Sequence, residues 1–163
     1  MRAEMSTALF PGSFDPFHDG HLEVVERAAR LFDEVVVAVV RNPQKAEPMF
    51  ALEERVAMLE ESVSGIDAAR IVSVSTLVVE VASDVGASAI IRGLRAVSDF
   101  ENELQMAQMN RQLSGIDTVF IPTSASRSFI ASRLLREVAR FGGDVSSMVP
   151  PPVARRLEKR FSR

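Results

Sequence analysis

Five short apolar runs, separated by stretches with helical spacing, constrain the fold of this chain more than any other feature. Each run is apolar almost throughout, which is typical of strands covered on both faces of a parallel sheet. Because crossovers between parallel strands are right-handed, the alternation of strand and helix patterns favours a doubly wound open sheet. The runs lie at residues 7–10, 35–40, 70–74, 87–91 and 118–121.

The stretches between the runs predict the helices. Ser98 and Glu101 stand at capping-box spacing, and Gly115 would end the helix that they begin. We therefore expect a Rossmann-like α/β fold in a single domain, residues 1–163, with five parallel strands and helices on both faces. The predicted helices span residues 22–32, 52–63, 76–85, 98–113, 128–141 and about 150–163.

The composition excludes several classes of site. The 163 residues include no cysteine, so a disulfide, a thiolate zinc site, an iron–sulfur cluster and a cysteine nucleophile are all excluded. The net charge of −3 argues against non-specific nucleic-acid binding, and the longest apolar run, residues 35–40, is far too short for a membrane span. We expect a cytoplasmic protein that binds neither nucleic acid nor membranes.

Basic and hydroxyl side chains follow four of the five predicted strands. The carboxyl ends of parallel strands meet at one edge of the sheet, so these side chains are expected to converge there. Convergence of cations from separate loops indicates an anionic ligand. The side chains are Ser13, His18 and His21 after the first strand, Arg41 and Lys45 after the second, Arg92 and Arg95 after the fourth, and Ser124, Ser126, Arg127 and Ser128 after the fifth.

Neither of the usual phosphate loops is present, which disfavours a dehydrogenase and a P-loop kinase. The first loop instead reads G-S-F-D-P-F-H-D-G-H over residues 12–21. Gly12 allows close backbone approach to a phosphate, and Ser13 adds a hydroxyl donor. Gly20 and His21 fall at the start of a helix, where free N–H groups favour anions.

His18 and His21 are the only histidines of the chain, and three interpretations of them stay open. They could cap the loop structurally. They could hold a metal with Asp15 or Asp19, although a third ligand is not obvious. They could also clamp a nucleotide triphosphate, with imidazole N–H groups directed at phosphate oxygens during transfer.

The loop at residues 12–21 resembles that of the H-x-G-H nucleotidyltransferases. The segments I-R-G-L-R-A at residues 91–96, Q-M-A-Q-M-N at 105–110 and R-E-V-A at 136–139 are similar to bacterial phosphopantetheine adenylyltransferase. So are Asn42, Pro43, Lys45, and the L-E-E-R segment at residues 52–55. The resemblance extends over nearly the whole chain and implies a single nucleotidyltransferase domain.

This resemblance implies transfer of the adenylyl group of ATP to 4′-phosphopantetheine, giving dephospho-coenzyme A and pyrophosphate. His21, Lys45 and Arg92 would be the catalytic residues. The implied substrate-binding residues are Ser13, Lys45, Leu77, Val78, Arg92, Met109, Asn110 and Glu137. The implied ATP-binding residues are Ser13, Phe14, His18, His21, Gly93, Arg95, Glu103, Ser128, Ile130 and Ser132.

The resemblance also implies partners and alternatives. Mg²⁺ would be carried by the ATP phosphates, the chain would form a homohexamer, and coenzyme A would feed back on the site. His18 is shared with related nicotinate-mononucleotide adenylyltransferases, which keeps a pyridine-mononucleotide substrate as one alternative. A cytidylyltransferase and a non-catalytic nucleotide-binding regulator are the others.

Four apolar side chains in the predicted fourth helix, Leu104, Met106, Met109 and Leu113, are predicted to fill the core. A pocket for the pantetheine arm or a subunit contact is the alternative. Asp15 is expected only to order the first loop through local hydrogen bonds.

Overall fold

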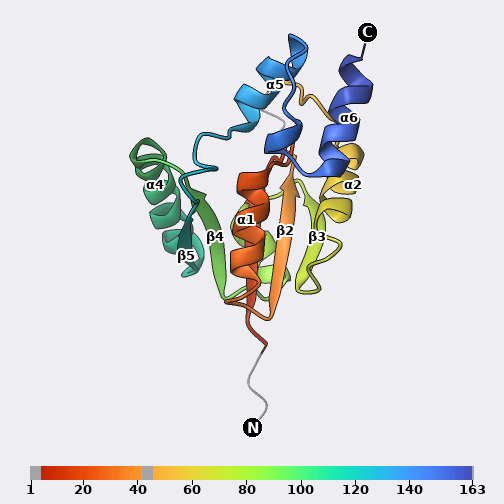
Figure 1. Cartoon of the computed structure of the whole chain (residues 1–163). Coiled ribbons are helices and arrows are strands. Elements are labelled where there is room, and N and C mark those ends of the chain that lie inside the picture. The colour runs from red at the N-terminus through yellow and green to blue at the C-terminus, as the bar shows by residue number, and fades with distance from the viewer. Residues whose placement is uncertain (1–4, 42–45, 163) are drawn as a thin grey trace.

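The computed structural model describes residues 5–41 and 46–162, and it contains a five-stranded parallel sheet (Figure 1). The strand order is β3-β2-β1-β4-β5, and all neighbouring strands are parallel. Successive strands are added toward one edge of the sheet from β1 to β3, and toward the other edge from β4 to β5. This arrangement confirms the predicted Rossmann-like, doubly wound open sheet, and it places the switch point between β1 and β4. The strands are β1 (Thr7–Gly12), β2 (Glu34–Val40), β3 (Ala69–Val74), β4 (Ala89–Leu94) and β5 (Asp117–Pro122).

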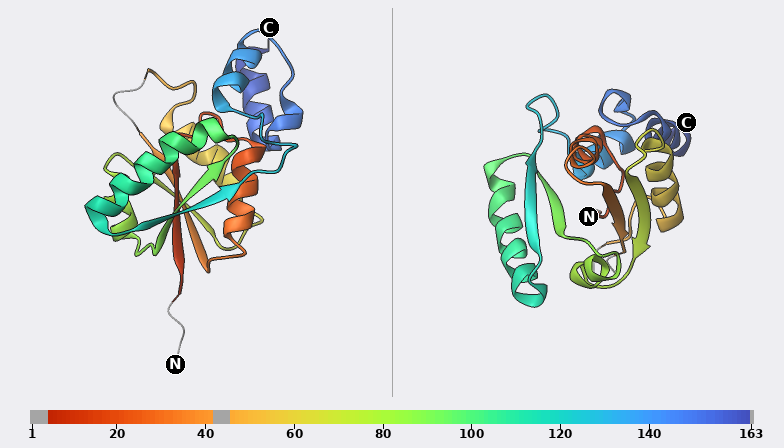
Figure 2. Two further views of the ribbon diagram at one scale, coloured as in Figure 1. Left: turned by 90° about the vertical axis from the view of Figure 1, so that its left-hand side faces the viewer. Right: turned by 90° about the horizontal axis from the view of Figure 1, so that it is seen from below.

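Helices cover both faces of the sheet, as predicted (Figure 2). The helices α1 (Asp19–Ala28), α2 (Leu52–Ser62) and α6 (Pro151–Phe161) pack on one face. The helices α3 (Val78–Asp84) and α4 (Val97–Ser114) lie on the other. The helix α5 (Ser132–Arg140) and the 3₁₀ turn η1 (Ser146–Met148) precede α6.

Strand β2 shows why these apolar runs fold into the centre of a two-sided sheet. Its residues from Val35 to Val39 are completely buried. Because successive side chains of a strand point to opposite faces, Val35 and Val37 pack beneath α1 and α2, whereas Val36 and Ala38 pack against α3. An apolar run without alternation therefore fills two cores at once.

Strand β4 lies further along the chain than the sequence predicts, at Ala89–Leu94 and not at residues 87–91, and this changes where two site residues lie. Arg92 and Gly93 were expected in the loop after the fourth strand, but they pair with Phe120 and Ile121 of β5 inside the sheet. Helix α4 then begins at Val97 with Ala96 as its N-cap, so the predicted capping box was wrong. Arg92 consequently projects from a hydrogen-bonded strand and not from a loop.

Helix α5 is shorter than predicted. It begins at Ser132 and not at residue 128, because the preceding residues fold into turns. The N–H of Arg127 donates to the carbonyl of Ser124, and the N–H of Ile130 donates to the carbonyl of Arg127. Residues 123–131 are thus free to form a wall of the site.

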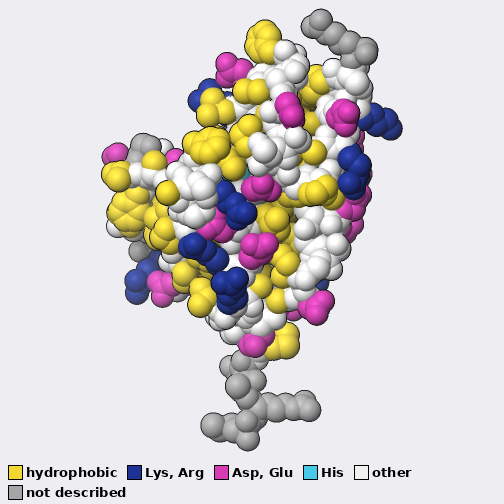
Figure 3. Space-filling model, in the orientation of Figure 1, with side chains coloured by type: hydrophobic (Ala, Val, Ile, Leu, Met, Phe, Trp, Pro, Cys, Tyr) yellow, Lys and Arg dark blue, Asp and Glu magenta, His cyan; other side chains and the backbone are white. Residues whose placement is uncertain are grey.

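The apolar side chains of α4 do not fill the core, so that prediction was wrong. Met106, Met109 and Leu113 are each more than half exposed, and Leu104 is more than a third exposed. Helix α4 lies at one edge of the sheet, and apolar side chains gather over it on the left of Figure 3. The structure therefore leaves an apolar stripe on the surface of the chain.

Candidate active site

Three of the four predicted loops converge on one pocket of about 620 Å³ at the carboxyl edge of β1 and β4. We call it the strand-edge pocket. Arg41, after β2, does not line it, and of the residues named after β5 only Ser128 does. Its walls come from residues 10–21, from the end of β4 with the start of α4, and from residues 123–136. Ten predicted site residues line it: Ser13, Phe14, His18, His21, Arg92, Gly93, Arg95, Glu103, Ser128 and Ser132.

Several predicted site residues do not line this pocket. Ile130 is buried behind the wall, where its carbonyl accepts a hydrogen bond from Arg95. The remainder belong to α3, α4 and α5 or the residues before them, and Lys45 lies outside the described residues. Those that lie away from the pocket wall are Leu77, Val78, Met109, Asn110 and Glu137.

The two histidines cap helix α1 by exchanging hydrogen bonds with its backbone. His18 is the N-cap, and its Nδ1 accepts from the N–H of Gly20 at 3.1 Å and of His21 at 3.3 Å. Nδ1 of His21 accepts in return from the N–H of His18 at 3.2 Å. The structural interpretation of the histidine pair is thus correct, and it leaves the opposite edge of each ring available for chemistry.

These hydrogen bonds determine where the imidazole protons lie. A nitrogen that accepts an N–H carries no proton, so each ring bears its proton on Nε2. Burial and then Arg95 lower the pKa of His18 to about 3. Burial, followed by electrostatic repulsion from His18, Arg92 and Arg95, also holds the pKa of His21 well below its ordinary value. Both rings are neutral Nε2–H donors at neutral pH.

The ring of His21 is fixed by aromatic contacts on several sides. It stacks on His18 with ring centroids 3.6 Å apart and lies nearly parallel to Phe17 at 5.6 Å. Phe14 meets it edge-on at 5.0 Å, with an interplanar angle of 87°. A donor held this way needs little reorganisation when a charge develops opposite it.

Two of the four arginines that line the pocket, Arg92 and Arg95, are held by carboxylates of α4. Arg92 makes two hydrogen bonds to Glu103, at 2.8 and 2.7 Å, and a third at 2.6 Å to the carbonyl of Pro11. Arg95 makes two longer hydrogen bonds to Asp99. Planar guanidinium groups held by such pairs are oriented before an anion binds.

Glu23 was missed by the sequence analysis. It lies on α1 and is only 6% exposed, and its carboxylate accepts from both the N–H and the hydroxyl of Ser124. It also forms salt bridges with Arg27 and Arg127. Glu23 thereby holds the wall that follows β5. A glutamate in a helical pattern carries no sequence signal that separates this role from a solvated side chain.

The metal interpretation of the histidines has little support in the part of the chain that the structure describes. No three carboxylates, histidines or cysteines gather there in a metal-binding group.

Asp15 bonds the backbone of a distant segment, because its two carboxylate oxygens accept from the N–H groups of Met49 and Phe50. These partners are distant in sequence, so the expectation of purely local hydrogen bonds for Asp15 was wrong.

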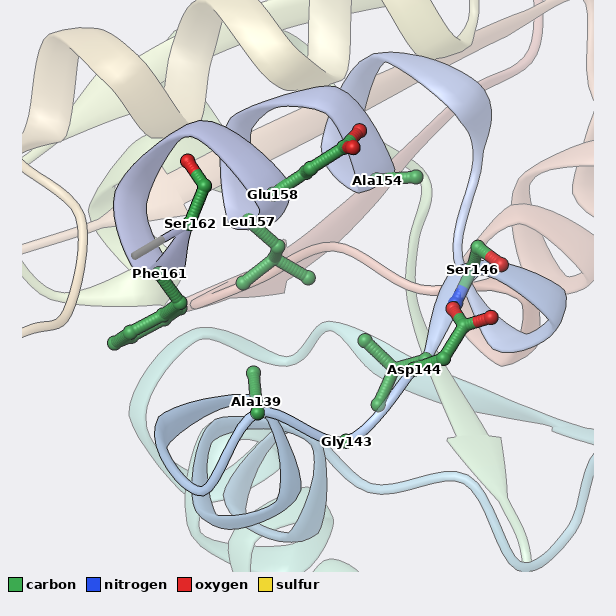
Figure 4. Close-up of a pocket in the computed structure, with 11 residues that line it drawn as sticks. Ala139, Gly143, Asp144, Ser146, Ala154, Leu157, Glu158, Phe161 and Ser162 are labelled. Carbon is green, nitrogen blue, oxygen red and sulfur yellow. The ribbon is translucent and has the colours of Figure 1, made fainter.

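A second cavity, of about 410 Å³, lies between the end of α5 and α6, and we call it the α5–α6 hollow (Figure 4). Leu157 and Phe161 of α6 face Ala139 of α5 across it. Among the described residues, its charged lining residues are two carboxylates, Asp144 and Glu158. None of the predicted site residues that the structure describes lines it.

Comparisons with known proteins agree with this geometry. A family profile described as cytidylyltransferase-like matches residues 9–138. A phosphopantetheine adenylyltransferase of Heliobacterium modesticaldum is 50% identical over 158 residues, which cover 96% of this chain and 94% of that protein. One of Gloeobacter violaceus is 51% identical over 156 residues, covering 95% and 96%. The chain belongs to the phosphopantetheine adenylyltransferase family.

Family membership confirms the resemblance drawn from the sequence and the predicted enzyme class, nucleotidyltransferase. A solved structure from Vibrio parahaemolyticus, provisionally named nicotinate-nucleotide adenylyltransferase, superposes with a TM-score of 0.68. The superposition covers 96% of this chain and 93% of that structure's chain, and the two sequences are 17% identical. At that identity the likeness supports the Rossmann-like fold alone.

Proposed function

We propose that this chain transfers the adenylyl group of ATP to 4′-phosphopantetheine, as an enzyme of coenzyme A biosynthesis. The products are dephospho-coenzyme A and pyrophosphate. The single observation that carries the proposal is 50% identity, over nearly the full length, to a phosphopantetheine adenylyltransferase. The strand-edge pocket supports it, because neutral N–H donors and oriented arginines face a space of about 620 Å³.

The reaction is a direct displacement at phosphorus. An oxygen of the phosphopantetheine phosphate attacks the α-phosphorus of ATP, and the bond to the β-phosphate oxygen breaks as pyrophosphate leaves. The attacking phosphate is already ionised at neutral pH, so no general base is needed. Placement in line and neutralisation of charge are the tasks that remain for the protein.

His21 performs the charge-stabilising task in this proposal. Its Nε2–H would donate to an oxygen of the α-phosphate as negative charge builds there. The ring is neutral, so it takes part through a hydrogen bond without gaining or losing a proton. His18, stacked against it, would donate to the ATP phosphates in the same tautomer.

The cations and hydroxyls divide between the two substrates. Arg92, with Ser13 and Lys45, would hold the phosphate of phosphopantetheine. Arg95 would hold ATP phosphates and exchange its weaker contacts to Asp99 for them. The ATP site would be completed by Phe14, Gly93, Glu103, Ser128 and Ser132, and Ile130 would contribute from behind the pocket wall, where its carbonyl holds Arg95.

Magnesium enters with ATP in this proposal. Of the carboxylates that line the pocket, Asp99 and Glu103 are already paired with Arg95 and Arg92, and Asp15 bonds backbone N–H groups. The described residues supply no separate cluster of three ligands. These residues therefore fit an ion that is carried on the triphosphate, where it would neutralise charge.

The pantetheine arm would extend beyond the strand-edge pocket. We propose that it meets Leu77 and Val78 at the start of α3, and Met109 and Asn110 on α4, with Glu137 on α5. Leu77 and Met109 are both more than half exposed, so they offer apolar surface to an extended, largely uncharged arm.

We also propose a single domain, a homohexamer, feedback by coenzyme A and a cytoplasmic location. The exposed stripe on α4 supports subunit contacts, because apolar side chains at helical spacing favour burial against another surface. Feedback would follow if coenzyme A, which shares the pantetheine arm, occupied the same pocket. In the described parts of the chain, every helix is too short or too polar to cross a bilayer.

The experiment is a pyrophosphate-release assay with ATP and magnesium, in which 4′-phosphopantetheine and nicotinate mononucleotide are offered in parallel. Release with phosphopantetheine alone is expected. Release with the mononucleotide alone would overturn the substrate assignment. No pyrophosphate release with either substrate, from folded protein that still binds ATP, would favour the non-catalytic regulator.

A further inference from the structure

Asp15 and Arg55 are two buried charges whose bonds connect distant parts of the chain. Arg55 lies on α2, outside the lining of the strand-edge pocket, and is only 3% exposed; Asp15 is 7% exposed. A buried ion is costly unless its hydrogen-bonding groups are satisfied. The partners of these two groups therefore indicate what they do.

Arg55 bonds three backbone carbonyls that are far apart in sequence. Its Nη1 donates to Ser13 at 2.7 Å and to Val40 at 3.3 Å, and its Nε donates to Phe50 at 3.1 Å. Asp15 completes the link, because its carboxylate accepts from the N–H groups of Met49 and Phe50 at 2.8 and 2.9 Å. We call this set of bonds the Asp15–Arg55 brace.

A second set of bonds holds the first loop from the side of α5. Nη1 of Arg136 donates to the carbonyl of Asp15 at 2.7 Å, and the hydroxyl of Ser132 donates to the carbonyl of Pro16 at 2.9 Å. The two peptide carbonyls that flank Phe14 in the sequence, those of Ser13 and Asp15, are therefore each fixed by a buried or half-buried arginine.

Phe14 itself has a strained backbone. Its φ is +49°, a left-handed conformation that is unfavourable for a bulky residue and persists only where its surroundings impose it. Its ring is buried and lies edge-on to His21 at 5.0 Å. It also fills the space beside Gly12, where a Cβ would lie 2.8 Å from Cζ of Phe14.

We propose that Arg55 and Asp15 are positioning residues for adenylyl transfer. The brace holds Phe14 in its left-handed conformation, and the ring of Phe14 in turn holds the imidazole of His21. Neither Arg55 nor the carboxylate of Asp15 needs to touch a substrate for this. The inference rests on the proposed function, because it takes His21 as the donor to the reacting phosphate.

The first test is kinetic and uses Arg55→Met, with Arg70→Met as the matched control. Arg70 is an exposed arginine on β3 that pairs with Glu34. Arg55→Met is expected to lower kcat by about tenfold or more and to change the KM for ATP by less than about threefold. Arg55→Lys, which keeps the charge but not the fork, should fall between Arg55→Met and the unaltered protein.

The second test asks whether the effect passes through His21. In a His21→Gln background, adding Arg55→Met should lower kcat by a further factor of less than about two, because the imidazole that Arg55 positions is already gone. A merely structural role would lower kcat equally in both backgrounds. Equal losses, or an unchanged kcat in folded Arg55→Met, would overturn the proposal.

Two further measurements cover failure to fold and failure of the proposed function. Asp15→Asn keeps one of the two acceptor oxygens, so it disturbs the brace less and can be used if Arg55→Met does not fold. The ¹⁵N imidazole signals of the two histidines can be followed without substrate, and the His21 signal should shift in Arg55→Lys and stay in place in Arg70→Met. If the unaltered protein released no pyrophosphate, the proposed function would fail. A His21 signal that does not shift in Arg55→Lys would separately overturn the proposal that the brace positions His21.

Discussion

The strand-edge pocket and the α5–α6 hollow are both concave, yet they are built from different chemistry. The first gathers arginines, histidines and hydroxyls from segments far apart in sequence, at the carboxyl edge of β1 and β4. The second is formed by α5, α6 and the residues that join them, and its charged groups are Asp144 and Glu158. Its anionic rim would repel a phosphate.

The difference between the two cavities shows that topology, and not concavity, locates the chemistry. Parallel strands deliver several loops to one edge, and the reversal between β1 and β4 leaves room between those loops. Segments adjacent in sequence, as around the α5–α6 hollow, supply only the side chains of one local stretch. The predictions below test this comparison.

Removal of the His21 imidazole should have the largest effect. His21→Ala is expected to lower kcat by roughly 100-fold or more, with little change in ATP affinity, because a donor to the transition state is lost. His21→Gln separates this role from capping, since glutamine at the third helical position supports a capping box. Turnover equal to that of the unaltered protein in both variants would contradict the proposed role.

Arg92 should be sensitive even to a change that keeps its charge. Arg92→Lys loses the planar fork that bonds Glu103 and Pro11, so kcat/KM for phosphopantetheine should fall by roughly tenfold. Arg155→Lys is the control, because Arg155 is an exposed arginine on α6 that pairs with Glu61. The comparison fails if both substitutions lower kcat/KM by the same factor.

Acidification should destabilise the fold through the histidine pair. His18 has a pKa of about 3 in the fold and 6.5 as its ordinary value, so between those pH values the unfolded chain binds a proton that the folded chain does not. Stability therefore decreases as pH falls below 6.5, by about 1.4 kcal/mol per pH unit for a single histidine. At pH 5 the total loss from His18, relative to a pH well above 6.5, is about 2 kcal/mol.

Chemical denaturation at several pH values checks this expectation. His18→Asn is the matched variant, because asparagine caps a helix but does not titrate. Its free energy of unfolding should fall less steeply with acidification, leaving mainly the contribution of His21, whose pKa is also lowered. Identical slopes in the two proteins would rule out His18 as a source of the pH dependence.

A change in the α5–α6 hollow should affect stability without affecting turnover. Gly142 has a φ of +82° at the end of α5, so Gly142→Ala should lower the free energy of unfolding by about 1 kcal/mol. Adenylyl transfer should remain within about twofold of the unaltered protein. A large loss of kcat, at a temperature where the variant is folded, would show that the two cavities are coupled.

Much of the fold and about half of the site could be predicted from the sequence. The five apolar runs predicted the sheet because burial on both faces demands apolar residues in sequence. The loop with His18 and His21 was predicted to contribute because the carboxyl edge of a parallel sheet collects such loops. The wrong predictions have three causes: the end of β4 depends on its pairing with β5, the start of α5 on the turns that precede it, and the exposure of the α4 stripe on the place of that helix at the sheet edge.

The sequence by itself determined the order of the elements, the edge on which the cations lie and, through its close relatives, the family. Only the tertiary structure decided that Arg55 and Glu23 are buried, what they hold, and which nitrogen of each histidine bears its proton. The physical reason is that periodicity reports whether a side chain faces the core. Hydrogen bonds to a backbone carbonyl or N–H many residues away leave no periodic trace, because any residue can supply those backbone groups.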